Sequence, residues 1–227
     1  MNYERVGAST GLAAALLLAV SFIIGVSPEP PALDASAASW ASFVDSQLDS
    51  LRVETFLNSL AIVLFLWFAG SVCAAQRRAE GGEGRLAATA LVGAAVGGGA
   101  LLTAQVFVAT ATVHPVLIAD DLLRLLFDVS ALMLGVGGAG LAVFFAAVAF
   151  GSLRFGGVPK AVGALSALVA LIAALGFVTV FTDDGVFAAD GAFGYWVRYA
   201  AFVVWLAAAS VSLIAASGAA ASGGRRR

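Results

Sequence analysis

Six apolar runs dominate this sequence, and each is about as long as a helix that crosses a lipid bilayer. Such a helix needs about 20 mostly apolar residues to span a hydrocarbon core of about 30 Å. The composition agrees, because 61% of the residues are hydrophobic and the mean hydropathy is +1.00, more than a soluble domain can bury. The predicted spans cover residues 8–26, 55–75, 86–108, 122–150, 161–181 and 195–217.

These runs predict α-helices and not β-strands. Inside hydrocarbon, every backbone N–H and C=O group must be hydrogen-bonded within its own segment or within a closed barrel. Barrel strands alternate polar and apolar residues, and the Ala, Leu, Val and Gly runs show no such alternation. The sequence therefore predicts an all-α membrane protein, with residues 1–227 forming a single transmembrane domain that is a bundle of six helices.

The connection between the first two spans contains one more predicted helix, over residues 39–51. Its apolar residues recur at helical spacing, which is typical of an amphipathic helix that lies on the membrane surface or over the mouth of a bundle. We expect an extracytoplasmic helix whose apolar side faces the bundle or the membrane. That side contains Trp40, Phe43, Val44, Leu48 and Leu51.

The basic residues predict the orientation of the bundle. Lys- and Arg-rich short loops stay in the cytoplasm. Nine of the twelve basic residues fall on the side of the bundle that holds both termini, whereas only three of the fourteen acidic residues do. We expect a multi-pass protein of a prokaryotic plasma membrane, with cytoplasmic termini and an acidic outer face. The nine basic residues are Arg5, Arg77, Arg78, Arg85, Arg154, Lys160 and residues 225–227.

Charges gather at the outer ends of the second, fourth and sixth spans. In the stretch DDLLRLLFDVS, residues 120–130, Asp121, Arg124 and Asp128 are three and four residues apart, so they share a helix face and can pair along it. A count of about 20 residues from the inner end of each span puts the other outer charges at a similar depth. The predicted outer-face polar cluster contains Arg124, Asp128, Asp121, Arg52, Glu54 and Arg198.

Two interpretations of this polar cluster follow from its position. The charges can anchor the helix ends and tie neighbouring helices together, or they can form a binding or ion-entry site at the outer mouth. The central ten or so residues of the predicted spans contain no Asp, Glu, Lys, Arg or His. Charge-coupled pumps need ionisable groups halfway across the membrane, so we do not expect a proton- or sodium-coupled pump.

The sequence contains no recognisable catalytic, cofactor or metal motif. His114 is the single histidine and Cys73 the single cysteine, so neither a zinc site nor a C-x-x-C pair can form. The stretch GVGGAG, residues 135–140, matches a dinucleotide-binding fingerprint in its letters only, because it lies within a predicted membrane helix with no strand before it. We expect these glycines, and Gly93 with Gly97, to let helices pack closely.

Several stretches resemble a known group of proteins: DASAASWASFVDSQLDSLRVETFLNSLAIVLFLWFAGSV, RRAEGGEGRLA and LFDVSALMLGVGGAGLAVFFAA. With most of the chain around them, they look like a family of uncharacterised multi-spanning membrane proteins of high-GC bacteria. The resemblance implies a helical membrane protein and assigns no site residues, cofactor or activity.

The sequence favours a non-enzymatic role that is structural, accessory or sensory, with an acidic extracytoplasmic face. The main alternative is a small-solute or ion transporter or channel without a charged midplane site, and an envelope enzyme with outer carboxylates is the third. The expected partners are the lipid bilayer and a membrane protein or second copy of the chain, with no nucleic acid. A midplane cavity with broken helices would favour transport.

Overall fold

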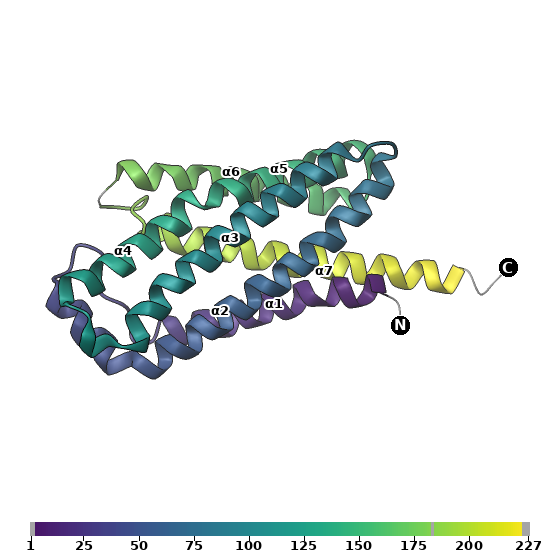
Figure 1. The fold of residues 1–227 in the computed structure, drawn as a ribbon. Coiled ribbons are helices and arrows are strands. Elements are labelled where there is room, and N and C mark those ends of the chain that lie inside the picture. The colour runs from purple at the N-terminus through teal and green to yellow at the C-terminus, as the bar shows by residue number, and fades with distance from the viewer. Residues whose placement is uncertain (1–2, 183, 224–227) are drawn as a thin grey trace.

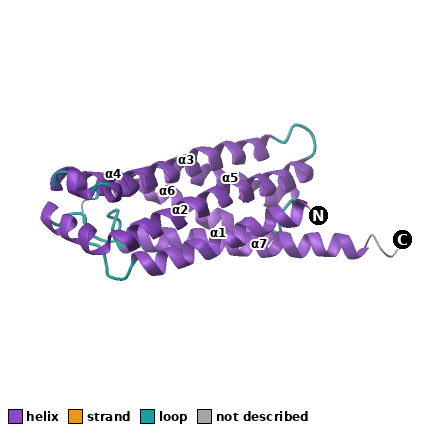
Figure 2. Ribbon diagram, turned by 60° about the horizontal axis from the view of Figure 1, so that its bottom comes forward, coloured by secondary structure: helices purple, strands orange, loops and turns teal. Residues whose placement is uncertain are grey.

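In a computed structural model of the protein, the described residues, 3–182 and 184–223, fold into helices without any strand (Figures 1 and 2). Residues 225–227, which contribute to the predicted charge asymmetry, lie outside that part. The α-helices are α1 (Tyr3–Gly25), α2 (Ala37–Glu80), α3 (Arg85–Val113), α4 (Asp120–Val136), α5 (Gly138–Phe155), α6 (Lys160–Leu175) and α7 (Arg198–Gly223). Three shorter segments are the 3₁₀ helices η1 (Pro115–Leu117) and η2 (Gly176–Phe181) and the π-helical segment η3 (Ala192–Val197).

Six helical stretches of the described chain are long and apolar enough to cross a membrane. This confirms the prediction of an all-α fold with six helices that could span a membrane. The stretches are Arg5–Gly25, Ala37–Glu80, Arg85–Val113, Asp120–Phe155, Lys160–Phe181 and Ala192–Ala216. Each contains one of the predicted spans or overlaps nearly all of it, and the connections between them carry the Gly, Pro and charged residues that end the helices.

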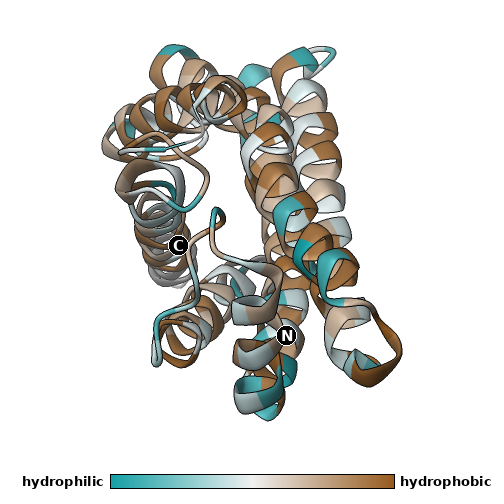
Figure 3. Ribbon diagram, turned by 90° about the vertical axis from the view of Figure 1, so that its left-hand side faces the viewer, coloured by the Kyte–Doolittle hydropathy of each residue, from teal (hydrophilic) through white to brown (hydrophobic). Residues whose placement is uncertain are grey.

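The helices form a closed ring. Along the ring, α1 packs against α2, α2 against α3, α3 against α4 and α5, α5 against α6, α6 against α7, and α7 against α1. Both ends of the described chain lie at the same end of the bundle (Figure 1). We call that end the terminal end and the other the distal end. Figure 3 looks onto the distal end and shows the helices arranged around a central space.

The predicted separate helix over residues 39–51 is absent, because these residues form the first part of α2. The helix begins after Ser36, whose side chain accepts a hydrogen bond from the Ser39 N–H, and it kinks at Gln47, where φ is −117°. The kink lets the first part lean on α4, where the rings of Trp40 and Phe127 stack with their centroids 4.6 Å apart. The predicted apolar side therefore faces the bundle, as an extension of the second span.

Three predicted spans are not continuous α-helices. The fourth breaks at Gly137, between α4 and α5, and the sixth begins with the π-helical segment η3. The fifth also tightens into a 3₁₀ helix from Gly176 onward. Such irregular backbone is tolerated at membrane depth where it is covered by protein or lines a cavity. All three irregular segments are close together, because the Arg198 side chain touches both Gly138 and Gly176.

Glycines bring α3 and α5 into close contact. A Cβ atom added at Gly97 would lie 2.7 Å from the backbone nitrogen of Leu141, and one added at Gly93 would lie 2.6 Å from that of Phe144. Gly140 faces Gly97 from the opposite helix. The predicted packing role of Gly93 and Gly97 is confirmed, since small residues let membrane helices approach closely.

Candidate functional site

A cavity of about 620 Å³ occupies the distal half of the bundle, and we call it the bundle cavity. Residues of all seven α-helices line it, and the loop between α1 and α2 covers part of it through residues 29–33. This volume falls within the range of about 300–1,000 Å³ typical of small-molecule sites. The walls are mostly apolar, with polar side chains at a few positions. Those polar lining residues are Glu29, Glu54, Thr55, Asn58, Gln105, Ser130, Asp190, Tyr195, Arg198 and Tyr199.

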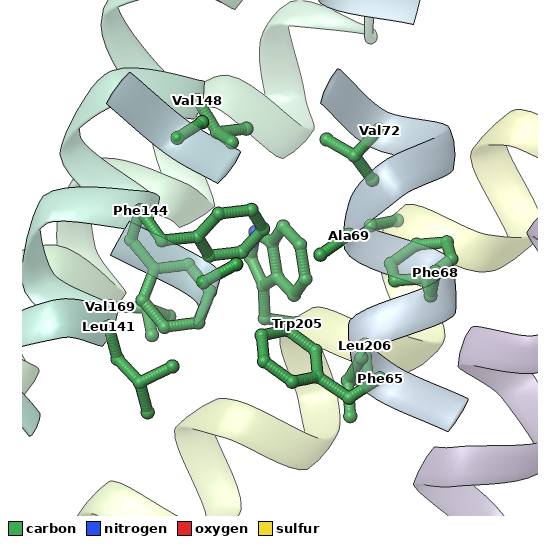
Figure 4. Close-up of a cluster of buried hydrophobic side chains, with 14 of the residues drawn as sticks. Phe65, Phe68, Ala69, Val72, Leu141, Phe144, Val148, Val169, Trp205 and Leu206 are labelled. Carbon is green, nitrogen blue, oxygen red and sulfur yellow. The ribbon is translucent and has the colours of Figure 1, made fainter. Parts of the chain in front are cut away.

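A layer of packed aromatic side chains, the aromatic floor, lies between the cavity and the terminal end, and Figure 4 shows Phe65, Phe144 and Trp205 within it. Phe145 and Phe202 line the cavity and pack against Trp205, Phe144 and Phe65 in the layer below. The Trp205 ring lies 4.8 Å from the Phe145 ring and 5.4 Å from the Phe144 ring, both nearly perpendicular. Its indole N–H donates a 2.7 Å hydrogen bond to the Ser166 hydroxyl. The cavity is therefore closed toward the terminal end.

Glu54 and Asn58 form an acidic wall of the cavity on α2. They are one helical turn apart, and the Asn58 side chain hydrogen-bonds to the Glu54 carboxyl group. Gly25, at the end of α1, leaves room for this carboxyl group, because a Cβ there would lie 2.7 Å from it. Tyr195 and Tyr199 line the same cavity, and their rings stack with centroids 6.2 Å apart. We call these four side chains, Glu54, Asn58, Tyr195 and Tyr199, the acidic wall.

Arg198 lies at the helix break and bonds to backbone. Its Nη2 atom donates to the carbonyl oxygens of Leu134 and Gly135, and Nη1 donates to that of Gly194 at 3.3 Å. The first two carbonyls belong to the last turn of α4, beside the break at Gly137. Arg198 thus links the start of α7 to the end of α4 by hydrogen bonds within an apolar stretch.

The position of Arg198 corrects two sequence-based expectations. Leu134 is about 15 Å further along α4 than Arg124, at 1.5 Å per residue, so the guanidinium groups of Arg198 and Arg124 do not lie together. A charged group also reaches the central part of the fourth span, which the sequence predicted to be free of charge. The reason is that a long side chain from the sixth span extends to the broken backbone of the fourth.

The rim of the cavity is held by two opposite charges. Arg124 donates a 2.8 Å hydrogen bond to the Leu33 carbonyl oxygen, and the Asp190 carboxylate accepts one of 2.9 Å from the Leu33 N–H. The loop between α1 and α2 is thereby tied to α4 and to the loop before η3. Arg124 also approaches Asp128, with Nε and Oδ2 3.8 Å apart.

The other predicted polar-cluster residues lie outside the cavity. Arg52 donates two hydrogen bonds to the Thr112 carbonyl oxygen, at 2.9 and 3.2 Å, and approaches Asp49 at 3.7 Å. Asp121 is exposed on α4. The structure therefore divides the predicted cluster: Glu54 and Arg198 line the cavity, Arg124 and Asp128 are at its rim, and Arg52 and Asp121 are on the outer surface.

Sequence reasoning missed eight of the ten polar cavity residues, among them Asn58, Tyr195 and Tyr199. Asn58 had an available signal, because it is a strongly polar residue within an apolar run and lies four residues after Glu54, on the same helix face. The two tyrosines are also four residues apart. Their orientation toward the cavity depends on the rotation of η3 and α7, which the apolar pattern does not specify.

Comparisons with known proteins add no family assignment. No protein-family model, no curated protein and no solved structure matches this chain.

Proposed function

We propose that this chain is a multi-pass protein of a prokaryotic plasma membrane, with its termini in the cytoplasm and its distal end outside. The basic residues near the terminal end support this orientation through the positive-inside rule. The position of both ends of the described chain at one end of the bundle is consistent with an even number of spans (Figure 1). The resemblance to proteins of high-GC bacteria stays a prediction.

We propose further that the protein is not an enzyme and that it binds a small amphipathic molecule in the bundle cavity. One observation carries this proposal: a cavity of about 620 Å³, closed below by the aromatic floor, with a few polar groups in mostly apolar walls. That combination is the usual form of a small-molecule site. A sensory or accessory protein would use such a site to couple ligand binding outside to a partner.

Transport of the bound molecule is the second candidate function. The break at Gly137 favours it, because discontinuous helices at the binding site are a feature of carriers. Transport requires the aromatic floor to open toward the terminal end. A cysteine at Val148, which is fully buried below that floor, would then react with reagents added from the terminal side. A protein that only binds its ligand would keep Val148→Cys protected.

A binding experiment with two matched tryptophan variants tests the cavity proposal. Ala131 lines the cavity, whereas Ala167 is exposed on α6, so Ala131→Trp fills cavity space and Ala167→Trp does not. The probe is 1-naphthol, an apolar body with one hydroxyl group, and the readout is the thermal unfolding midpoint in a non-ionic detergent. Ligands that bind the folded state raise this midpoint.

We expect 1-naphthol to raise the unfolding midpoint of the natural protein and of Ala167→Trp, but not that of Ala131→Trp. Partitioning of the probe into micelles is the same for all three proteins, so it cannot produce the difference. Equal shifts in Ala131→Trp and Ala167→Trp, or no shift in any of them, would refute binding in the cavity.

A further inference from the structure

The Glu54 carboxyl group has no cation beside it. Among the described residues, no Lys, Arg or His nitrogen lies within 4.0 Å of its oxygens. It is half-buried in a mostly apolar cavity. A carboxylate in such surroundings is stabilised by a partner that donates hydrogen bonds or carries positive charge.

Asn58 extends this set of acceptors. The Asn58 amide uses its NH₂ group toward Glu54, because its oxygen makes no hydrogen bond. The amide oxygen, Oδ1, then points elsewhere, and it is buried with no hydrogen-bond partner in the described part of the chain. A buried polar atom without a partner is uncommon in folded proteins and calls for a missing donor.

Aromatic rings line the same cavity as these acceptors. Tyr195 and Tyr199 both face it, and their rings stack with that of Phe22, at centroid distances of 6.2 and 5.0 Å. Aromatic faces attract cations, most strongly where water is excluded. The acidic wall therefore combines a carboxylate, an unpaired carbonyl oxygen and aromatic faces, all of which favour a positively charged hydrogen-bond donor.

Arg198, the other charged group deep in the cavity, does not supply this donor. Its Nη atoms are bound to carbonyl oxygens of Leu134, Gly135 and Gly194, which hold the guanidinium at the helix break. A bare metal ion fits the remaining surfaces poorly, because aliphatic and aromatic side chains form most of the cavity walls.

We propose that the acidic wall binds the ammonium group of an organic amine whose apolar body fills the rest of the cavity. The inference rests on the proposed function, since it names the class of ligand that the cavity takes. An ammonium group has three hydrogen-bond donors and no acceptor. It can donate to the Glu54 carboxylate and to Asn58 Oδ1 while contacting the tyrosine rings. A free amine and the head group of an aminophospholipid carry the same chemistry.

Isothermal titration calorimetry in a non-ionic detergent tests the proposal with three aromatic probes, the first two of which share a phenyl body. Phenethylamine carries the ammonium group, 3-phenylpropionate carries a carboxylate, and 1-naphthol provides an uncharged aromatic reference. We expect phenethylamine to bind at least about tenfold more tightly than 3-phenylpropionate, the effect of about one hydrogen bond to a charged group. Glu54→Gln should remove that advantage.

Matched variants separate this proposal from the cavity proposal. Asp121→Asn also removes a carboxylate, but from the exposed outer surface of α4, and it should leave phenethylamine affinity unchanged. Asn58→Leu, which removes the unpaired acceptor, should weaken phenethylamine binding and leave 1-naphthol binding intact. If 1-naphthol binds and Glu54→Gln has no effect on phenethylamine, the ammonium site is wrong and the cavity proposal survives.

Short-chain lipids distinguish the two sources of the amine. Dihexanoylphosphatidylethanolamine has an ammonium head group, and dihexanoylphosphatidylglycerol does not. If the first lipid binds more tightly than phenethylamine and Glu54→Gln weakens its binding, the site belongs to a lipid head group. If phenethylamine binds more tightly than the first lipid, the site belongs to a free amine. Either order supports ammonium recognition. Recognition of ammonium would be overturned if 3-phenylpropionate bound as tightly as phenethylamine, or if dihexanoylphosphatidylglycerol bound as tightly as dihexanoylphosphatidylethanolamine.

Discussion

Replacement of Gly97 by alanine should destabilise the bundle, because the new methyl group would lie between α3 and α5. The Cβ atom would be 2.7 Å from the backbone nitrogen of Leu141, and a backbone atom cannot move aside as a flexible side chain can. Gly99, two residues later on the same helix, has nothing within 4 Å of its Cβ position. The pair of variants Gly97→Ala and Gly99→Ala therefore differs in packing and shares the change in helix propensity.

The magnitude follows from two opposing effects. Overpacking by one methyl group in a well-packed core costs about 1–3 kcal/mol. Alanine gains about 1 kcal/mol over glycine in a helix, and this gain cancels when the two variants are compared. We expect the free energy of unfolding of Gly97→Ala to be about 2 kcal/mol lower than that of Gly99→Ala.

The assay is unfolding of the purified protein in mixed micelles, titrated with a denaturing detergent and followed by tryptophan fluorescence. In a thermal scan, a difference of about 2 kcal/mol corresponds to a lower midpoint by about 4–8 °C for a chain of this size. A Gly97→Ala protein as stable as Gly99→Ala would refute the close approach of α3 and α5.

Two further predictions concern hydrogen bonds that join separate elements. Ser166→Ala leaves the buried indole N–H of Trp205 without its acceptor, and it should lower the free energy of unfolding by about 1–3 kcal/mol in a denaturation titration; an unchanged value would contradict that bond. Asp190→Ala removes the acceptor of the Leu33 N–H and should speed hydrogen exchange of that amide, measured by mass spectrometry. Asp121→Ala, which removes an exposed carboxylate, is the control. If the Leu33 amide exchanged equally fast in Asp190→Ala and Asp121→Ala, Asp190 would not hold the loop between α1 and α2.

The number of membrane-length helices could be predicted from the sequence, because apolar length alone decides whether a helix can cross a bilayer. The helical character of residues 39–51 and the inward side of Trp40 also followed from apolar spacing. Whether this segment forms a helix separate from the second span could not be predicted. No Pro or Gly separates residues 39–51 from the second span, and the kink at Gln47 depends on packing against α4.

The cavity could not be predicted, because it depends on the rotation and continuity of individual helices. Glu54 was placed at the outer end of its span, and its orientation toward Gly25 and Tyr195 is set by neighbouring helices. The glycine-rich stretch at residues 135–140 suggested close packing, and it also contains the break at Gly137. Beside that break, Arg198, more than 60 residues away in sequence, donates hydrogen bonds to carbonyl groups of α4.

Cysteine accessibility tests the central claim, an outward-facing cavity inside the bundle, most directly. Ile62 lines the cavity and is 4% exposed, whereas its neighbour Val63 is 52% exposed on the outside of α2. The two positions lie at the same depth and differ in what they face. Cys73, the only cysteine of the chain, is first replaced by alanine.

Whole cells that express Ile62→Cys or Val63→Cys are treated with a charged, membrane-impermeant thiol reagent. We predict that Ile62→Cys is labelled and that Val63→Cys is not, because a thiol facing hydrocarbon does not ionise to the reactive thiolate. Labelling at Val63→Cys as fast as at Ile62→Cys, or protection of both, would contradict an outward-facing cavity.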